Sequence, residues 1–120
     1  MIFIVDDDRS VRTSLTRLMR SAGYQAQAFA GAEGYLHDVA AGTASCVILD
    51  LHMPGMSGLE LQEVMVRREP SVPVIVLTAC EDAEMRAKSL ASGAATVLRK
   101  PCDGVVLLRA VSEAIGPPPA

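Results

Sequence analysis

The fold is decided by one stretch of strand, loop and helix start, CVILDLHMPGMSG at residues 46–58. Its first four residues, 46–49, are apolar and precede Asp50, and a continuous apolar run predicts a strand that is covered on both faces. The proline and glycine that come next mark a loop. Ser57 is then a candidate helix N-cap, with Glu60 three residues later to complete a capping box. The stretch therefore predicts a strand–loop–helix unit with a carboxylate at the carboxyl end of its strand.

The same unit recurs along the chain. Segments with apolar residues at helical spacing follow each apolar run and end near a glycine or a proline. Five consecutive strand–helix units with right-handed crossovers predict an α/β fold, in which helices cover both faces of an open parallel sheet. The other predicted strands are residues 2–5, 25–29, 74–77 and 95–98. Of these, 25–29 alternates polar and apolar residues, as an edge strand does.

Length and composition exclude several classes of function. The 120 residues, 50% of them hydrophobic, suffice for one domain with a buried core and are not typical of a disordered chain. There are 14 acidic and 11 basic residues, a net charge of −3, and 3% of residues are aromatic, which disfavours direct nucleic-acid binding. The apolar runs are too short to span a membrane, and the N-terminus lacks the pattern of a signal peptide. Three cysteines without metal-binding spacing predict free thiols in the cytoplasm.

Polar residues follow four of the predicted strands. In open α/β sheets, sites form outside the carboxyl ends of the strands. A strand order of 2-1-3-4-5 would place these four strand ends side by side, so their side chains would converge on one crevice. The residues concerned are Asp6 and Asp7 after the first strand, Asp50 after the third, Thr78 after the fourth and Lys100 after the fifth.

Three carboxylates in one crevice require positive charge. Like charges about 4 Å apart repel by several kcal/mol at the effective dielectric of a protein. Lys100 supplies one positive charge, and a hard divalent cation such as Mg²⁺, which binds carboxylate, carbonyl and water oxygens, would supply two more. A carboxylate beside such a Lewis acid is placed to attack a phosphoryl group, whose oxygens Thr78 and Lys100 would hold.

Five segments form a pattern that is specific in combination: IVDDD at 4–8, LDLHMPGMSG at 49–58, VLTA at 76–79, SGA at 92–94 and RKP at 99–101. With them the chain resembles the receiver domain of bacterial two-component response regulators over residues 1–116. The loop and first helix look most like the FixJ-type transcriptional regulators, which continue into a DNA-binding domain. The resemblance implies a flavodoxin-like (βα)5 three-layer sandwich with a five-stranded parallel sheet of strand order 2-1-3-4-5.

The resemblance also assigns roles to the predicted site. It implies that Asp50 accepts a phosphoryl group, that Thr78 is a switch hydroxyl which turns toward the acyl phosphate, and that Lys100 pairs with that phosphate. The metal, Mg²⁺ or alternatively Mn²⁺, would be held by Asp6, Asp7 as a direct ligand, Asp50 and the backbone carbonyl of His52.

A phosphorylation switch is the function that the resemblance implies. A sensor histidine kinase would donate the phosphoryl group, and the domain would promote its own phosphorylation and slow dephosphorylation without turning over a separate substrate. DNA would be bound only by a C-terminal output domain, and no membrane would be contacted. A second copy of the chain would dock on the helix that includes 85–91, the strand 95–98 and the helix after Asp103.

One position departs from the family pattern. The aromatic residue that rotates inward with the switch hydroxyl in receivers would fall at Val97, and valine has no ring. We therefore expect phosphorylation to perturb the helix through 85–91 and the strand 95–98 less than in ring-bearing receivers. Two other positions agree with the family: Ala79 leaves room above the acceptor, and the Lys100–Pro101 bond is expected to be cis, which an X-Pro bond adopts at little cost.

Other readings of the same residues stay open. One alternative is that an aspartate such as Asp7 or Asp8 serves only as a helix N-cap, although this leaves Asp50 unexplained. Asp6-x-Asp8 also resembles haloacid-dehalogenase phosphatases, but Ser10 stands where those enzymes prefer Thr or Val. Asp50-x-His-x-x-Gly matches a cobalamin-binding loop, without the later Gly-Gly of that pattern. Finally, the valine in place of the aromatic residue is compatible with a receiver that acts only as an interaction module.

Two features lie outside this site. Cys80 and Cys102 follow neighbouring predicted strands, so a redox link between their loops is an alternative to free thiols. The proline-rich end, 117–120, predicts the start of a stiff linker after a receiver domain over 1–116.

Overall fold

The computed structural model describes residues 1–79 and 82–118, in which strands and helices alternate as the sequence predicts. The strands are β1 (Ile2–Val5), β2 (Ala26–Phe29), β3 (Cys46–Leu49), β4 (Val74–Thr78) and β5 (Thr96–Arg99). The helices are α1 (Arg9–Ser21), α2 (Ala32–Asp38), α3 (Gly58–Arg68), α4 (Ala83–Ala91) and α5 (Gly104–Ile115). All paired strands are parallel, and their order is β2-β1-β3-β4-β5, which confirms the predicted fold class.

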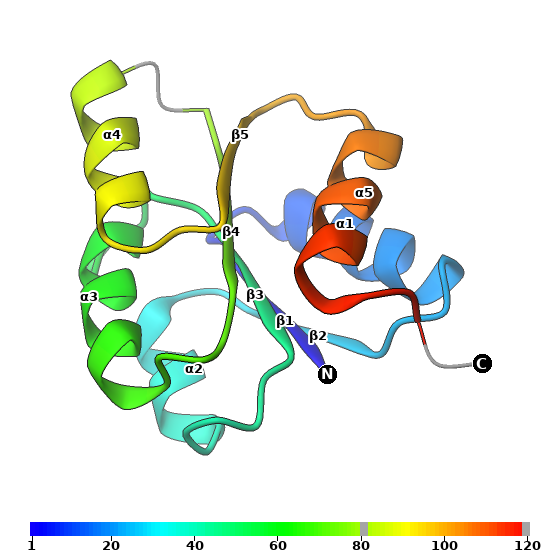
Figure 1. The fold of residues 1–120 in the computed structure, drawn as a ribbon, viewed down its shortest axis with the longest axis horizontal. Coiled ribbons are helices and arrows are strands. Elements are labelled where there is room, and N and C mark those ends of the chain that lie inside the picture. The colour runs from blue at the N-terminus through cyan, green and yellow to red at the C-terminus, as the bar shows by residue number, and fades with distance from the viewer. Residues whose placement is uncertain (80–81, 119–120) are drawn as a thin grey trace.

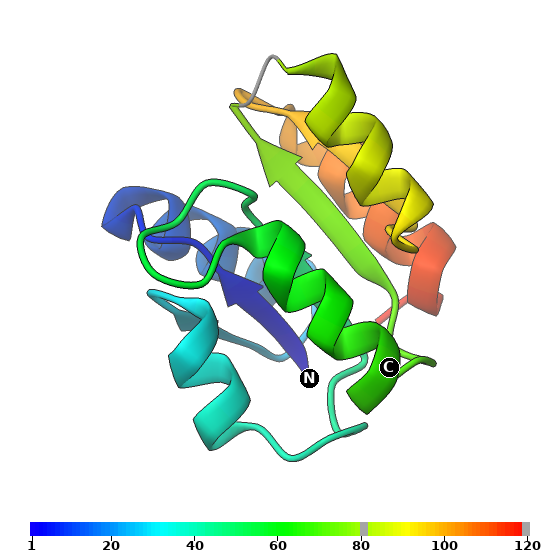
Figure 2. The same cartoon turned by 90° about the vertical axis from the view of Figure 1, so that its left-hand side faces the viewer.

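Helices cover both faces of the sheet and make three layers (Figures 1 and 2). Successive residues of a strand point to opposite faces. Ile4 and Ile48 therefore pack in the core that includes α1 and α5, whereas Val5 and Leu49 pack in the core that includes α2 and α3. Because both faces of the central strands are buried, their sequences are continuously apolar.

Local capping sets where the helices begin. The Asp8 side chain accepts hydrogen bonds from the backbone N–H groups at the start of α1, so the N-cap reading is correct for this residue. Ser57 and Glu60 form the predicted capping box at the start of α3. Asp103 caps α5. These interactions begin each helix directly after the loop that carries residues of the predicted site.

The two edge strands differ from the central ones. The nearly continuous apolar sequence of β5 predicted a strand that is covered on both faces. In the structure, its residues are instead half-buried or exposed. Its position explains the difference, because only β4 pairs with it and one side of the strand stays open. β2 is the other edge strand, as predicted, but its burial alternates only from Ala26 to Ala28, because Phe29 is half-buried against the core under α2 and α3.

The far end of the domain returns to the turn between α1 and β2. The Tyr24 hydroxyl donates a hydrogen bond of 2.9 Å to the carbonyl oxygen of Gly116. Pro119 and Ala120 lie outside the described residues, so the linker over 117–120 stays a prediction. Among the helices of the described residues, none is long and apolar enough to cross a membrane.

Candidate functional site

Three carboxylates meet at the carboxyl edge of the sheet, the upper edge in Figure 1. One oxygen from each of Asp6, Asp7 and Asp50 lies within 4.8 Å of the others. Asp6 and Asp50 are buried, with 3% and 7% of their surface exposed, whereas Asp7 is exposed. The crevice predicted from the strand ends therefore exists, and it has two buried walls and an open side.

The register of the central strands brings these residues together. Val5 on β1 lies opposite Leu49 on β3, so the next residue of each chain segment, Asp6 or Asp50, leaves the sheet at the same level. The backbone N–H of Asp50 donates to the Val5 carbonyl at 3.0 Å. The sheet hydrogen bonds thus hold the two buried carboxylates on adjacent strands.

Lys100 brings a positive charge to the same edge. Its Nζ lies 2.7 Å from Oδ2 of Asp6 and 3.4 Å from Oδ2 of Asp50. Burial of the ammonium group lowers its pKa, but the hydrogen bond to Asp6 and the negative charges of Asp50 and Asp6 outweigh this, so the pKa lies above its ordinary value. Lys100 is therefore protonated at neutral pH.

Thr78 and Pro101 adjoin this lysine. Thr78 ends β4 and is fully buried, and its carbonyl accepts a 2.9 Å hydrogen bond from the backbone N–H of Lys100. The Lys100–Pro101 peptide is cis, as predicted. The last residues of β4 and β5 are thus tied to each other beside the carboxylates.

Short turns shape the backbone around the acids. The Asp8 N–H donates to Oδ1 of Asp6 at 2.9 Å, and the His52 N–H donates to Oδ1 of Asp50 at 3.3 Å. His52 itself is exposed. Its backbone is thus held next to Asp50, where a carbonyl ligand was predicted, and that ligand role stays a prediction.

The donor set fits a hard divalent cation. Asp6, Asp7 and Asp50 carry three negative charges and Lys100, which pairs with Asp6 and Asp50, carries one positive charge, so these four side chains together carry −2. Carboxylate oxygens are ligands that Mg²⁺ prefers, and this ion usually retains several waters. A cleft of about 350 Å³ opens between Asp7 and the loop around His52, which leaves room for water or a substrate.

Sequence reasoning missed contacts that join distant segments. The Arg12 side chain donates from Nη1 to the Asp6 carbonyl at 3.0 Å. Glu33 accepts a 2.9 Å hydrogen bond from the backbone N–H of Met56, 23 residues away. Neither Arg12 nor Glu33 belongs to a motif. Because each bonds to a backbone group, which every residue type offers, the sequence at the partner position does not indicate the contact.

The remaining positions named in the sequence analysis lie on or beyond β4 and β5. Val97 on β5 pairs with Val76 and is half-buried against the core under α2 and α3. Ala79 is exposed beyond the end of β4. Cys102 is half-buried, but Cys80 lies outside the described residues, so a redox link between them stays untested.

Comparisons with known proteins point to one family. The family model described as "Response regulator receiver domain" matches residues 2–112. Among curated proteins, the transcriptional regulatory protein TdiR of Thauera aromatica is 40% identical over 114 residues, which cover 95% of this chain and 50% of TdiR. The transcriptional regulatory protein FixJ of Azorhizobium caulinodans is 33% identical over 115 residues, covering 96% of this chain and 54% of FixJ. FixJ proteins are thus relatives, as predicted, and TdiR matches at higher identity.

Solved structures agree with these sequence matches. The response regulator StyR superposes with a TM-score of 0.87 at 38% identity, over 95% of this chain and 58% of StyR. A CheY-like receiver domain protein of Methanospirillum hungatei superposes with a TM-score of 0.90 at 28% identity, over 95% and 91% of the two chains. The chain spans about half the length of the curated relatives that it matches.

Proposed function

Because the chain belongs to the response regulator receiver family, we propose that its acidic crevice accepts a phosphoryl group on Asp50. The observation that carries this proposal is the buried Asp50 carboxylate, whose neighbours are two further carboxylates and the Lys100 ammonium group. A carboxylate of this kind can act as a nucleophile toward phosphorus. The phosphatase and cobalamin readings lose support, because the family match spans residues 2–112.

In the proposed reaction, an oxygen of Asp50 attacks the phosphorus of a phosphohistidine on a sensor histidine kinase. The new O–P bond forms as the P–N bond breaks, and the imidazole leaves with the electron pair and takes up a proton. Attack of water on the acyl phosphate later releases inorganic phosphate and restores the carboxylate. The domain thus promotes both its phosphorylation and its dephosphorylation.

Lys100 and Thr78 are proposed to hold the transferred group. The ammonium group lies 3.4 Å from Asp50, close enough to pair with a phosphoryl oxygen attached there. Thr78 ends the neighbouring strand beside Lys100, with the backbone hydrogen bond between them holding the two strand ends together. We propose that its hydroxyl turns to the acyl phosphate and passes the change toward α4.

Mg²⁺ is the metal that we propose, with Mn²⁺ an alternative. Its ligands would be Asp6, Asp7, Asp50 and the backbone carbonyl of His52, a set that offers only oxygen atoms. When bound, the ion offsets negative charge on the acids and on the phosphoryl oxygens. The excess of two negative charges among Asp6, Asp7, Asp50 and Lys100 supports a divalent cation.

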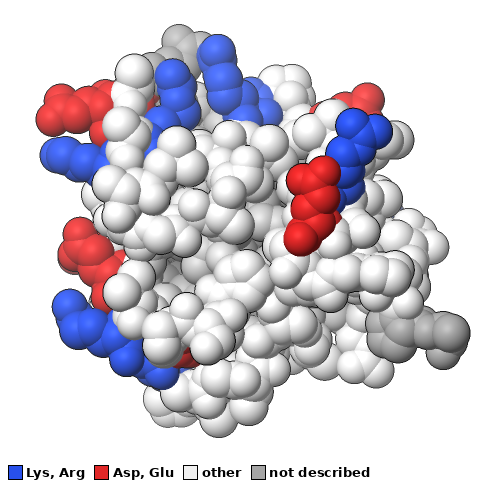
Figure 3. All heavy atoms as spheres, viewed as in Figure 1, with Lys and Arg blue, Asp and Glu red and all other residues white. Residues whose placement is uncertain are grey.

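The proposed partners follow from the same switch. A sensor histidine kinase in the cytoplasm would be the donor, and an output domain in a longer protein would bind DNA and control transcription. A second copy of this chain would dock on α4, β5 and α5. Leu90, Val105 and Val106 support this surface, because they are 52%, 65% and 47% exposed. Figure 3 shows uncharged surface between α4 and α5, with an acidic and a basic side chain over α5 and further charged side chains along α4.

Incubation with Mg²⁺ and phosphoramidate, followed by intact mass measurement, tests the proposal. We expect one phosphoryl group on the wild-type chain and none on Asp50→Asn. Asp38→Asn is the matched control, since Asp38 is exposed at the end of α2 and should leave the adduct unchanged. No adduct on the wild-type chain, or an adduct that survives in Asp50→Asn, would refute Asp50 as the acceptor.

A further inference from the structure

Glu33 connects α2 to the loop between β3 and α3. Its Oε1 accepts a 2.9 Å hydrogen bond from the backbone N–H of Met56. The two residues come from different strand–helix units, and the bonded N–H is two residues before the start of α3. This bond therefore links the second helix to the loop that follows the proposed phosphoryl acceptor.

The backbone leaves space that fits this carboxylate. A Cβ atom on Gly55 would lie 2.8 Å from Oε1 of Glu33, and Gly55 has a φ of +75°, where side chains are strained. A Cβ atom on Gly31 would lie 3.3 Å from Oε2. The hydrogen bond from the Met56 N–H, and to a lesser extent one from the backbone N–H of Glu33 itself, hold the pKa of the Glu33 carboxyl below its ordinary value. Glu33 is therefore an anion at neutral pH, and its exposed side chain reaches the backbone near Gly31 and Gly55.

Other contacts hold the two ends of the same loop. At its start, the His52 N–H donates to Asp50, and at its end the capping box fixes Ser57. Glu33 bonds to the loop between these two points, beside Gly55, where the backbone bends. The loop also forms one wall of the cleft that Asp7 faces. Gly55 and Met56 do not line this cleft themselves, but they join Pro54 to Ser57, which do.

We propose that Glu33 is a positioning residue of the phosphorylation site, which holds the β3–α3 loop so that His52 presents its backbone to the acidic crevice. This inference rests on the proposed function. Among the described residues, Glu33 makes no hydrogen bond or ion pair with the three acids or with Lys100, so its effect would pass through the Met56 N–H.

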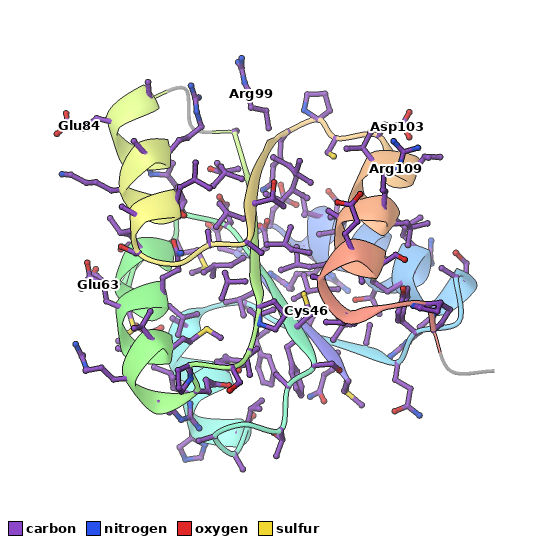
Figure 4. All side chains as sticks on the ribbon, viewed as in Figure 1. Cys46, Glu63, Glu84, Arg99, Asp103 and Arg109 are labelled. Atoms are coloured by element: carbon purple, nitrogen blue, oxygen red, sulfur yellow. The ribbon has the colours of Figure 1, made fainter. Side chains whose placement is uncertain are left out.

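Two substitutions separate the hydrogen bond from the charge. Glu33→Gln keeps an acceptor oxygen and loses the charge, whereas Glu33→Ala loses both. Glu63→Ala is the matched control, because it removes the same charge from α3 while its side chain points outward (Figure 4). For each variant, Mg²⁺ affinity is measured by titration without a phosphoryl donor, and hydrogen exchange of the Met56 amide is measured by NMR.

We expect Glu33→Ala to weaken Mg²⁺ binding by roughly 3- to 10-fold, at or below the low end of effects seen for residues that support metal ligands. Its Met56 amide should exchange faster. Glu33→Gln should stay near wild type in both measurements, as should Glu63→Ala. Equal weakening in Glu33→Gln and Glu33→Ala would overturn the inference in favour of a charge effect.

The outcome also distinguishes this inference from the proposed function. If the wild-type chain binds Mg²⁺ and Glu33→Ala binds it equally well, the positioning role is wrong and the phosphorylation site stands. If the wild-type chain binds neither Mg²⁺ nor Mn²⁺ and forms no phosphoryl adduct, both proposals fail. If the phosphoryl adduct forms on Glu33→Ala with the same Mg²⁺ dependence as on the wild-type chain, only the role of Glu33 is again rejected.

Discussion

Replacing Gly58 with alanine should lower the free energy of unfolding by about 3 kcal/mol, the upper part of the range for an overpacked site. Gly58 begins α3 and lies against the end of β3. A Cβ atom there would be 2.0 Å from the carbonyl oxygen of Asp50 and 2.7 Å from Cα of Leu51. Cβ contacts below 3.0 Å essentially never occur, so one backbone segment must move by about 1 Å.

Two features place the loss in free energy of unfolding of Gly58→Ala in the upper part of this range. Both contacts are to backbone atoms, which cannot rotate away as the end of a side chain can. The same backbone also makes a 3.0 Å hydrogen bond from the Gly58 N–H to the Leu51 carbonyl, which the movement would stretch. In a chain of this length, about 3 kcal/mol corresponds to a fall of roughly 12 °C in melting temperature.

Urea denaturation of both proteins measures this difference. The matched control is Gly34→Ala in α2, where a Cβ atom would lie 3.4 Å from Phe29, an ordinary contact. Alanine is favoured over glycine by roughly 0.5–1 kcal/mol inside a helix, so this variant should be at least as stable as the wild type. The reasoning about Gly58 would be refuted if Gly58→Ala stayed within about 0.5 kcal/mol of the wild type with an unchanged denaturant slope.

Three further predictions concern the core and the switch. Tyr35→Phe removes the hydroxyl that donates to buried Glu69 at 2.7 Å, so the free energy of unfolding should fall by about 1–3 kcal/mol. Urea denaturation measures this change, and unchanged stability would contradict the prediction. Burial raises the Cys46 pKa from 9.0 to about 12. Above pH 9 the thiol ionises only in the unfolded chain, so the free energy of unfolding should fall by up to about 1.4 kcal/mol per pH unit until about pH 12. Urea denaturation of the wild type and Cys46→Ala across this pH range measures the effect, and the variant should lack this part of the fall. An equal slope in both proteins would rule out Cys46 as its source. Because Val97 has no ring, phosphorylation should cause smaller amide NMR shift changes on α4 and β5 than in ring-bearing receivers, and changes as large as theirs would argue against this.

Much of the fold is visible in the sequence because it depends on neighbours along the chain. Apolar runs such as Cys46–Leu49 mark the strands, and side chains such as Ser57 mark helix starts through contacts only a few residues away. The acids and Lys100 could be recognised as one site because the carboxyl ends of parallel strands share an edge. Half-burial of β5 was not predicted, since its apolar residues resemble those of a central strand.

By itself, the sequence determined the alternation of strands and helices, the caps and the residue types at the carboxyl edge of the sheet. Each of these depends on periodicity or on hydrogen bonds between near neighbours. Only the tertiary structure decided which other distant groups touch: Glu33 with the Met56 N–H, and the backbones at Gly58 and Asp50. Such contacts depend on how the helices pack on the sheet. A hydrogen bond to a backbone N–H, or a close approach of two backbones, can be made to almost any residue type, so the partner carries no mark in the sequence.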